Sequence, residues 1–335
     1  MARLVVTGGM GFIGSAFVRR RLAAGKDEVV VVDKLTYAGN PNNLKAFKDD
    51  PHLSFVQGDV CDRGLMDRVV RGADAVVHFA AETHVDRSIL DAGSFVTTDV
   101  VGTYTVLEAC RKADVPRLLH ISTDEVYGEA GTTPCAESAP LLPKSPYAAS
   151  KAGADRLAWS YFATYGSPVV ISRCTNNYGP YQHPEKLIPL FVTNALEDRP
   201  LPMYGEGKDS RDWIHVEDHC AALDLLLASP GVEGEVFNIG AGQERDVRTI
   251  GTAILRALDK PSSLLHSVPD RPGHVARHAV DWTKIRTRLG WKPVRTFEEG
   301  LQETIDWYRR NEPWWKPVKS GEFRDYYRVQ YRGLS

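Results

Sequence analysis

The stretch LVVTGGMGFIG at residues 4–14 decides the fold, because it joins an apolar run to a helical pattern through a glycine-rich turn. Glycines at positions 8, 11 and 14 let the backbone turn tightly, approach a pyrophosphate and pack the helix against the strand. The N-terminus of such a helix adds free N–H groups and positive partial charge. Glycine trios are common in turns, but this one has the preceding strand and following helix that dinucleotide binding requires. The stretch therefore predicts a dinucleotide-binding turn.

The second apolar run, residues 29–32, ends at Asp33, and this position predicts which dinucleotide is bound. A carboxylate here can accept hydrogen bonds from both hydroxyls of an adenosine ribose and would repel a 2′-phosphate. We therefore expect NAD rather than NADP. Asp59, at the end of the third run, is a further candidate for the adenine edge. The alternative is a structural strand–helix turn without a ligand.

Apolar, β-branched runs alternate with longer helical patterns through the first half of the chain. The runs are at residues 4–7, 29–33, 53–56, 75–79, 118–122 and 169–173. Such short continuous strands separated by helices indicate a parallel sheet covered on both faces, a doubly wound α/β fold of the Rossmann type. After about residue 176 prolines and glycines become frequent and the elements shorten.

We therefore expect two parts packed as one unit. Residues 1–175 form an NAD-binding Rossmann domain that carries the catalytic residues. Residues 176–335 form mostly a smaller ligand-binding lobe, and some segments of this range can return to the sheet. The lobe should cover the carboxyl edge of the sheet, where ligands bind in open α/β folds.

Composition excludes several classes of protein. A net charge of −2 gives no overall field that would draw the chain onto nucleic acid or anionic lipid. No apolar run approaches the roughly 18 residues that a membrane span needs, and the N-terminal run is too short for a signal peptide. The five cysteines are scattered without a CxxC pair, which argues against a disulfide framework or a zinc site. We expect a cytoplasmic protein with no metal, nucleic acid or membrane partner.

Tyr147 and Lys151 are the first candidates for catalysis, because the i, i+4 spacing puts them on one helical face. An ammonium close to a phenol favours the phenolate and can lower its pKa from about 10 towards neutrality. The pair could then take a proton from an alcohol while a hydride leaves its carbon. Alone, such a pair is usually an ordinary surface pair. After a complete dinucleotide fingerprint we interpret it as catalytic.

The chain as a whole resembles a known family. Residues 8–14, Asp33, AAETH at 80–84, Thr123 and Tyr147 with Lys151 resemble the extended short-chain dehydrogenase/reductases that act on nucleotide sugars. Several stretches are similar to signatures of the dTDP-glucose 4,6-dehydratases: STDEVYG at 122–128, HVDRS at 84–88, NNYGPY at 176–181, KLIP at 186–189, DRPGH at 270–274 and VKSGE at 318–322. The resemblance covers nearly the whole chain.

This resemblance implies a lyase that converts dTDP-glucose to dTDP-4-keto-6-deoxyglucose. C4 is oxidised, water is eliminated across C5 and C6, and the hydride returns to C6, in a homodimer that holds NAD. A nucleotide-sugar 4-epimerase is the alternative enzyme. A non-enzymatic NAD-sensing or scaffold protein of this fold is a third reading, which predicts a broken catalytic set.

The neighbouring carboxylates Asp124 and Glu125 favour the dehydratase over the epimerase, which needs only the redox step. Dehydration needs a base for the C5 proton and a protonated acid for the C6 hydroxyl. Two adjacent carboxyls can divide these roles, because their repulsion helps to hold one protonated. Adjacent residues in a regular strand point to opposite faces, so both reach one sugar only if the backbone leaves strand geometry here. A helix-capping Thr-Asp-Glu is the alternative.

The resemblance also assigns roles to individual residues, with Asp124 as the acid and Glu125 as the base. The catalytic set is Thr123, Asp124, Glu125, Tyr147 and Lys151. The cofactor-binding set is Gly8, Gly11, Phe12, Ile13, Gly14, Asp33, Lys34, Thr36, Asp59, Val60, Ala80, Ala81, Thr98, Tyr147, Lys151 and Asn177. The substrate-binding set is Thr83, His84, Arg87, Asn176, Lys186, Leu187, Tyr204, Arg211, Asn238, Arg271 and His274.

Chemistry supports part of this assignment. The planar fork of arginine suits phosphate oxygens, so Arg211 and Arg271 could neutralise a diphosphate, although a surface salt bridge is the alternative for either. Three positions depart from the family pattern. Thr83 replaces a serine, Asp99 replaces an asparagine, and Val275 stands where an aspartate is usual.

Overall fold

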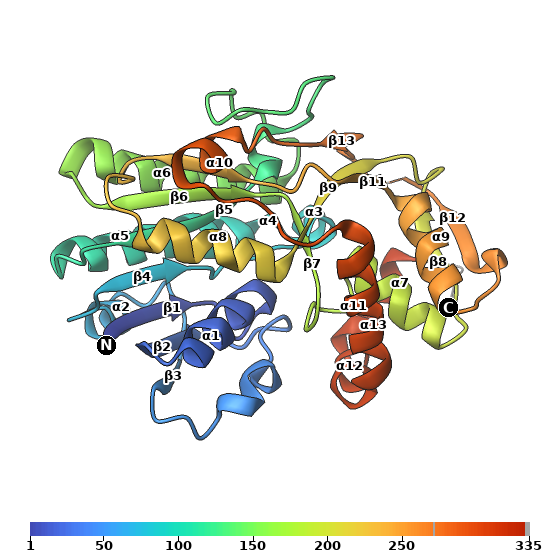
Figure 1. The fold of residues 1–335 in the computed structure, drawn as a ribbon, viewed down its shortest axis with the longest axis horizontal. Helices are drawn as coiled ribbons and strands as arrows, with labels where there is room; N and C mark the ends of the chain where they lie inside the picture. Colours follow the sequence, from blue (N-terminus) through green and yellow to red (C-terminus); the bar gives the residue numbers. More distant parts are fainter. Residues whose placement is uncertain (271, 332–335) are drawn as a thin grey trace.

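The computed structural model describes residues 1–270 and 272–331, and a parallel sheet of seven strands lies at its centre (Figure 1). From edge to edge the strands are β10 (Val236–Ile239), β6 (Val169–Cys174), β5 (Leu118–Thr123), β4 (Ala75–His78), β1 (Ala2–Thr7), β2 (Asp27–Asp33) and β3 (Leu53–Gln57). All of these strands except β10 were predicted from the sequence. The predicted doubly wound α/β fold is confirmed.

The direction in which the strands are added reverses between β1 and β4. The chain builds β2 and β3 on one side of β1, and β4, β5, β6 and β10 on the other. The loops after β1 and β4 therefore leave the sheet in opposite directions and open a crevice at its carboxyl edge. In open α/β sheets this switch point is where ligands bind.

Helices cover both faces of the sheet, because neighbouring strand residues such as Val5 and Val6 point to opposite faces and both are fully buried. Val6 packs in a core with side chains of α1 (Phe12–Ala24), α8 (Val216–Ala228) and α10 (Thr283–Leu289). Val5 packs in a second core with side chains of α2 (Arg63–Val69), α5 (Thr103–Lys112) and α6 (Pro146–Tyr165). Burial on both sides explains why the strands read as continuous apolar runs.

The connection from β4 to α5 contains an unusual turn. After α3 (Val85–Leu90) and α4 (Ala92–Phe95) the chain forms a π-helical turn, η2 (Val96–Gly102), which runs directly into α5. π-Helical turns are rare and occur frequently at functional sites. This one packs against α6, the helix that carries Tyr147 and Lys151.

Most of the second half forms a lobe beyond the carboxyl ends of the sheet strands (Figure 1). Its strands are β7 (Asn176–Tyr178), β8 (Leu201–Tyr204), β9 (Ser210–His215), β11 (Glu244–Asp246), β12 (Leu265–Val268) and β13 (Arg277–His278). Its helices are α7 (Leu187–Leu196), α9 (Val247–Ala257), α11 (Phe297–Arg310), α12 (Glu312–Val318) and α13 (Glu322–Gln330). The 3-10 turn η4 (Ser262–Leu264) also belongs to the lobe, whereas the 3-10 turns η1 (Pro41–Phe47) and η3 (Asp124–Tyr127) belong to the first half of the chain. The lobe has its own apolar core.

The second half also returns to the Rossmann sheet. Helix α8 packs against α1, and β10 completes the edge of the sheet beside β6. The predicted boundary at residues 175/176 therefore does not separate two independent bodies. Within residues 1–270 and 272–331, none of the helices combines the length and apolar character needed to span a membrane.

Candidate active site

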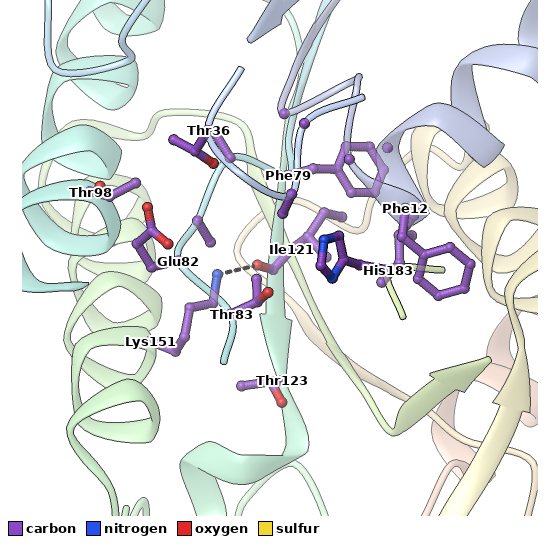
Figure 2. Close-up of a pocket in the computed structure, with 18 of the residues that line it drawn as sticks. Phe12, Thr36, Phe79, Glu82, Thr83, Thr98, Ile121, Thr123, Lys151 and His183 are labelled. Atoms are coloured by element: carbon purple, nitrogen blue, oxygen red, sulfur yellow. Dashed lines mark hydrogen bonds between the residues drawn. The ribbon is translucent and has the colours of Figure 1, made fainter. Parts of the chain in front are cut away.

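One cavity at the carboxyl edge of the sheet is lined by every residue predicted to bind the cofactor and by the whole predicted catalytic set. Figure 2 shows its walls, with Phe12 and His183 on one side and Thr98, Glu82 and Lys151 on the other. The structure thus brings together side chains from the ends of β1, β2, β4, β5 and β7 and from the first turns of α6.

The glycine-rich turn leaves room for a ligand close to the backbone. Gly8 has φ +69°, and a Cβ there would lie 2.6 Å from the backbone nitrogen of Ala80. A Cβ on Gly14 would lie 2.3 Å from the carbonyl oxygen of Gly8, so only glycine allows α1 to begin so close to β1. No side chain caps α1 at Gly11. The first turn of this helix therefore suits a phosphate anion.

Asp33 is held in place at the end of β2. Its carboxylate accepts hydrogen bonds from the backbone N–H of Met10 at 2.9 Å and of Leu35 at 2.8 Å. Burial raises the pKa of Asp33, and these two bonds counteract that rise. Each carboxylate oxygen can still accept a further hydrogen bond, so the residue fits a ribose diol. Nearby, Lys34 forms an ion pair with Asp59 at 2.7 Å.

Helix α6 positions Tyr147 and Lys151. Ser145 caps the helix, its side chain accepting from the N–H of Ala148 at 3.1 Å, and Pro146 occupies the first helical position. Tyr147 therefore lies in the first turn and Lys151 one turn later on the same face. The Lys151 ammonium donates to the carbonyl oxygen of Ile121 at 2.7 Å, the dashed line in Figure 2.

The surroundings of Tyr147 oppose its ionisation. Burial raises the pKa of Tyr147 well above its usual value, and the carboxylates of Glu125 and Asp99 raise it further. Burial also lowers the pKa of Lys151. The expectation that the Lys151 ammonium lowers the pKa of the Tyr147 phenol stays a prediction.

The backbone leaves strand geometry where the paired carboxyls require it. Strand β5 ends at Thr123, and the 3-10 turn η3 begins at Asp124. The Thr123 hydroxyl accepts from the N–H of Glu125 at 3.3 Å, so Thr123 is the capping residue of this turn. Asp124 and Glu125 are left to line the same cavity.

Asp124 is the more enclosed of the two carboxyls, with 3% of its surface exposed. Burial first and the charge of Glu125 second raise the pKa of Asp124 well above its usual value. One oxygen interacts with the Thr123 hydroxyl at 3.3 Å, whereas Oδ2 has no hydrogen-bond partner among the residues that the structure describes. The arrangement favours a protonated carboxyl that can donate to a ligand in the cavity.

Four of the predicted substrate residues line two adjoining cavities. Thr83, Asn176 and Lys186 line the main cavity, and the Lys186 ammonium donates to the carbonyl oxygen of Thr83 at 2.6 Å. Arg211 lines a smaller adjoining cavity that Glu125 also borders. The sugar end of a ligand could thus reach Glu125 while its charged end reaches Arg211.

The other predicted substrate residues lie outside the main cavity as the described residues form it. Arg87 pairs with Glu185 at 3.0 Å and stacks on Tyr37. Tyr204 ends strand β8, and its hydroxyl donates to a carboxylate oxygen of Asp86 at 3.0 Å. The rest of this set are His84 at the start of α3, Leu187 at the start of α7, and His274, 2.5 Å from Asp270. Arg271 lies outside the described residues.

Asn238 does not line either of these two cavities, and its assignment as a substrate contact stays a prediction. Asn238 is fully buried, and its amide donates to the carbonyl oxygens of Cys135 and Asp281. Its oxygen accepts from the hydroxyl of Tyr127, the last residue of η3, at 2.7 Å. These hydrogen bonds connect Asn238 to the turn that carries the carboxyls.

Several residues that line the cavity are absent from the predicted sets, among them Gln182, His183 and Glu185. Glu185 is 4% exposed and meets Arg87. A signal was present, because these residues lie between two stretches already singled out, at 176–181 and 186–189.

Known proteins share both the sequence and the fold of this chain. The family model described as GDP-mannose 4,6 dehydratase matches residues 5–304. A dTDP-glucose 4,6-dehydratase of Streptomyces niveus is 51% identical over 323 residues, which cover 95% of this chain and 96% of that protein. The crystal structure of DesIV, a dTDP-glucose 4,6-dehydratase from Streptomyces venezuelae with NAD bound, is 52% identical, with a TM-score of 0.93 over 95% of this chain and 100% of that one.

An epimerase is a more distant match. The UDP-glucose 4-epimerase of Thermus thermophilus, solved with NAD, is 33% identical, with a TM-score of 0.85 over 92% of this chain and 99% of that one. The chain is therefore similar over nearly its full length to proteins of both kinds, and more similar to the two dehydratases.

Proposed function

The chain belongs to the GDP-mannose 4,6 dehydratase family, and from this premise we propose that it is a dTDP-glucose 4,6-dehydratase, a hydro-lyase that uses NAD. The observation that carries the proposal is the pair Asp124 and Glu125 in one cavity with Tyr147 and Lys151. An epimerase needs only the second pair. The product is dTDP-4-keto-6-deoxyglucose.

The cofactor end of the cavity suits NAD. We assign the pyrophosphate to the turn between Gly8 and Gly14, and the adenosine ribose to Asp33. The remaining predicted cofactor residues line the same space. Bound NAD supplies a reversible hydride acceptor beside the sugar, so the overall reaction consumes none of it.

Tyr147 serves as the base for the C4 hydroxyl. Its phenol lies one helical turn from Lys151, whose ammonium is fixed on the Ile121 carbonyl. A fixed cation stabilises the Tyr147 phenolate, which accepts the proton of the C4 hydroxyl and becomes a phenol as the hydride leaves C4. Thr123 contacts both Tyr147 and Asp124, and it lies between the redox pair and the acid.

Elimination then falls to the two carboxyls. Oxidation at C4 acidifies the C5 proton, and Glu125 removes it. Asp124, held protonated by burial and by its neighbour, donates a proton to the departing C6 hydroxyl. The sugar lies against Thr83 and Asn176, with Lys186 close by, and Arg211 neutralises the diphosphate together with Arg271.

Three further proposals concern the whole protein. Residues 1–175 supply the NAD site and the catalytic residues, and residues 176–335 supply most substrate contacts. The protein acts as a homodimer, as the sequence resemblance implies. The five unpaired thiols are in keeping with a reducing compartment, the cytoplasm.

The test is incubation of the purified protein with dTDP-glucose and, separately, with UDP-glucose. We expect a 4-keto product from dTDP-glucose, detected by its absorbance in alkali, with the mass of the substrate less one water. We expect slower conversion of UDP-glucose. A product of unchanged mass, epimeric at C4, would contradict the proposal.

A further inference from the structure

A buried carboxylate lies beside the redox pair and has no place in the mechanism above. Asp99 is 1% exposed and belongs to the π-helical turn η2, which packs against α6. Thr98, the residue before it, and Glu82 lie on the same side of the cavity as Lys151 (Figure 2). The turn thus places the Asp99 carboxylate against helix α6, which carries Tyr147 and Lys151.

Both oxygens of Asp99 are engaged. Oδ2 accepts from the Ser150 hydroxyl at 2.6 Å, and Oδ1 accepts from the backbone N–H of Glu82 at 2.8 Å. Ser150 adjoins Lys151 in α6, and its hydroxyl also donates to the carbonyl oxygen of Tyr147. Asp99 is therefore fixed to the segment that connects the two members of the redox pair.

Among the described residues, Asp99 interacts electrostatically with an ammonium, a phenol and a carboxylate. From α6 they are the Lys151 ammonium and the Tyr147 phenol, and from the loop after β4 the Glu82 carboxylate. Burial lowers the pKa of Lys151, and Asp99 is the strongest influence in the opposite direction. For Tyr147, burial and Glu125 raise the pKa, and Asp99 raises it further.

We propose that Asp99 is a positioning residue whose negative charge sets the pH range in which the Tyr147–Lys151 pair works. It keeps Lys151 charged although Lys151 is buried, and it makes Tyr147 a stronger base. The inference rests on the proposed function, since it concerns the oxidation at C4. It assigns to Asp99 no contact with substrate or cofactor.

The sign of the effect follows from the geometry. A negative charge favours the protonated form of every neighbouring group, so it raises the pKa of both the ammonium and the phenol. Burial raises the pKa of Asp99 itself to about 6, against the opposing influence of Lys151 and its hydrogen bonds. The carboxylate is therefore charged at neutral pH and loses its charge as the pH falls through about 6.

Asp99→Asn tests the charge, because it keeps the size of the side chain. Both limbs of the pH profile for C4 oxidation, measured as reduced nicotinamide formed in a single turnover, should shift to lower pH by about one unit. Ser150→Ala is the matched control, since it removes a hydrogen bond but keeps the charge. Its alkaline limb, where Asp99 is fully charged in both proteins, should stay where it is in the wild type. Coincident profiles for Asp99→Asn and wild type would overturn the inference.

A second measurement needs neither substrate nor turnover. Carbon NMR of labelled lysine in the NAD-bound protein, with the signal assigned through Lys151→Arg, should show a step near pH 6 as Asp99 titrates. The step should move to higher pH in Ser150→Ala, because the lost hydrogen bond favoured the charged carboxylate. It should vanish in Asp99→Asn. This readout keeps the inference testable if Asp99→Asn does not fold or if dTDP-glucose is not the substrate. Absence of the step in the wild type contradicts it.

Discussion

Asp124 and Glu125 are neighbours in the chain but occupy different environments. Asp124 is the first residue of the turn that follows β5, and its side chain is buried. Glu125, the second residue, is half-buried and borders two cavities. Desolvation disfavours the charge of the more enclosed carboxyl, and the charge of its neighbour adds to that effect. The proposed division into acid and base, which sequence could take only from a family resemblance, is thus supported by a physical argument.

The two carboxyls should be separable from the redox pair by substitution. In Asp124→Asn and Glu125→Gln, C4 oxidation should still occur, because Tyr147 and Lys151 remain. Net dehydration should fall by about 10²-fold or more in each, the range for one acid–base group. Rapid mixing with dTDP-glucose should show reduced nicotinamide accumulating. A double variant with near wild-type turnover would mean that the pair is only structural.

Asp33 should decide the choice of dinucleotide. The purified protein should retain NAD, and after removal of the cofactor it should bind NAD more tightly than NADP. Asp33→Ser should weaken NAD binding by about tenfold or more, as expected for loss of a hydrogen bond to a charged group. It should weaken NADP binding far less, because the repulsion of the 2′-phosphate is also removed. Titration calorimetry measures both constants, and equal affinity of the wild type for the two would refute the assignment.

The turn η3 is hydrogen-bonded to a buried ion pair that joins strand β6 to helix α6. Arg173 of β6 donates to both oxygens of Asp155 of α6 at 2.8 Å, and also to the Tyr127 hydroxyl at 2.8 Å. Arg173 and Asp155 are 1% and 0% exposed. Burial alone would raise the pKa of Asp155, but the pairing with Arg173 first and with Arg156 second lowers it to about 2. The network ties the turn with the carboxyls to the helix with Tyr147.

Breaking this pair should be costly. Arg173→Met leaves Asp155 charged and buried, and should lower the free energy of unfolding by about 3–5 kcal/mol in urea titrations. Asp155 also pairs with Arg156, which is 47% exposed, so Arg156→Met is a control for the same carboxylate and should cost less than about 1 kcal/mol. The double variant Arg173→Met/Asp155→Leu should recover most of the loss. Equal effects of the two arginine substitutions would contradict this account.

At the scale of elements, sequence pattern succeeded where a strand is long, β-branched and buried on both faces. Strand β10 was not predicted, because its four residues VFNI show no periodicity that distinguishes a strand from a buried helix segment. The π-helical turn η2 was also not predicted, since nothing in VTTDVVG marks it as different from the helix that follows. Only the structure shows that this turn brings Asp99 into contact with α6.

The whole molecule explains which parts of the site could be predicted. The cofactor end is built from the ends of successive strands, so residues such as Gly8 and Asp33 follow directly from strand boundaries. The substrate end depends on contacts between distant segments, such as Lys186 with Thr83, 103 residues away. The burial of Asn238 depends on Tyr127, 111 residues away. Local pattern carries no information about such pairings, so family resemblance had to supply these residues.

The central claim is that one cavity performs oxidation, elimination and reduction on the same sugar. The most direct test uses dTDP-glucose with deuterium at C4, and in parallel unlabelled dTDP-glucose in heavy water. The C4 deuterium should reappear at C6 of the product, because the hydride is returned after water has left. In heavy water the product should carry deuterium at C5, since the proton removed by Glu125 exchanges with solvent. A product without the label at C6, or with the label back at C4 and the substrate mass unchanged, would contradict the account.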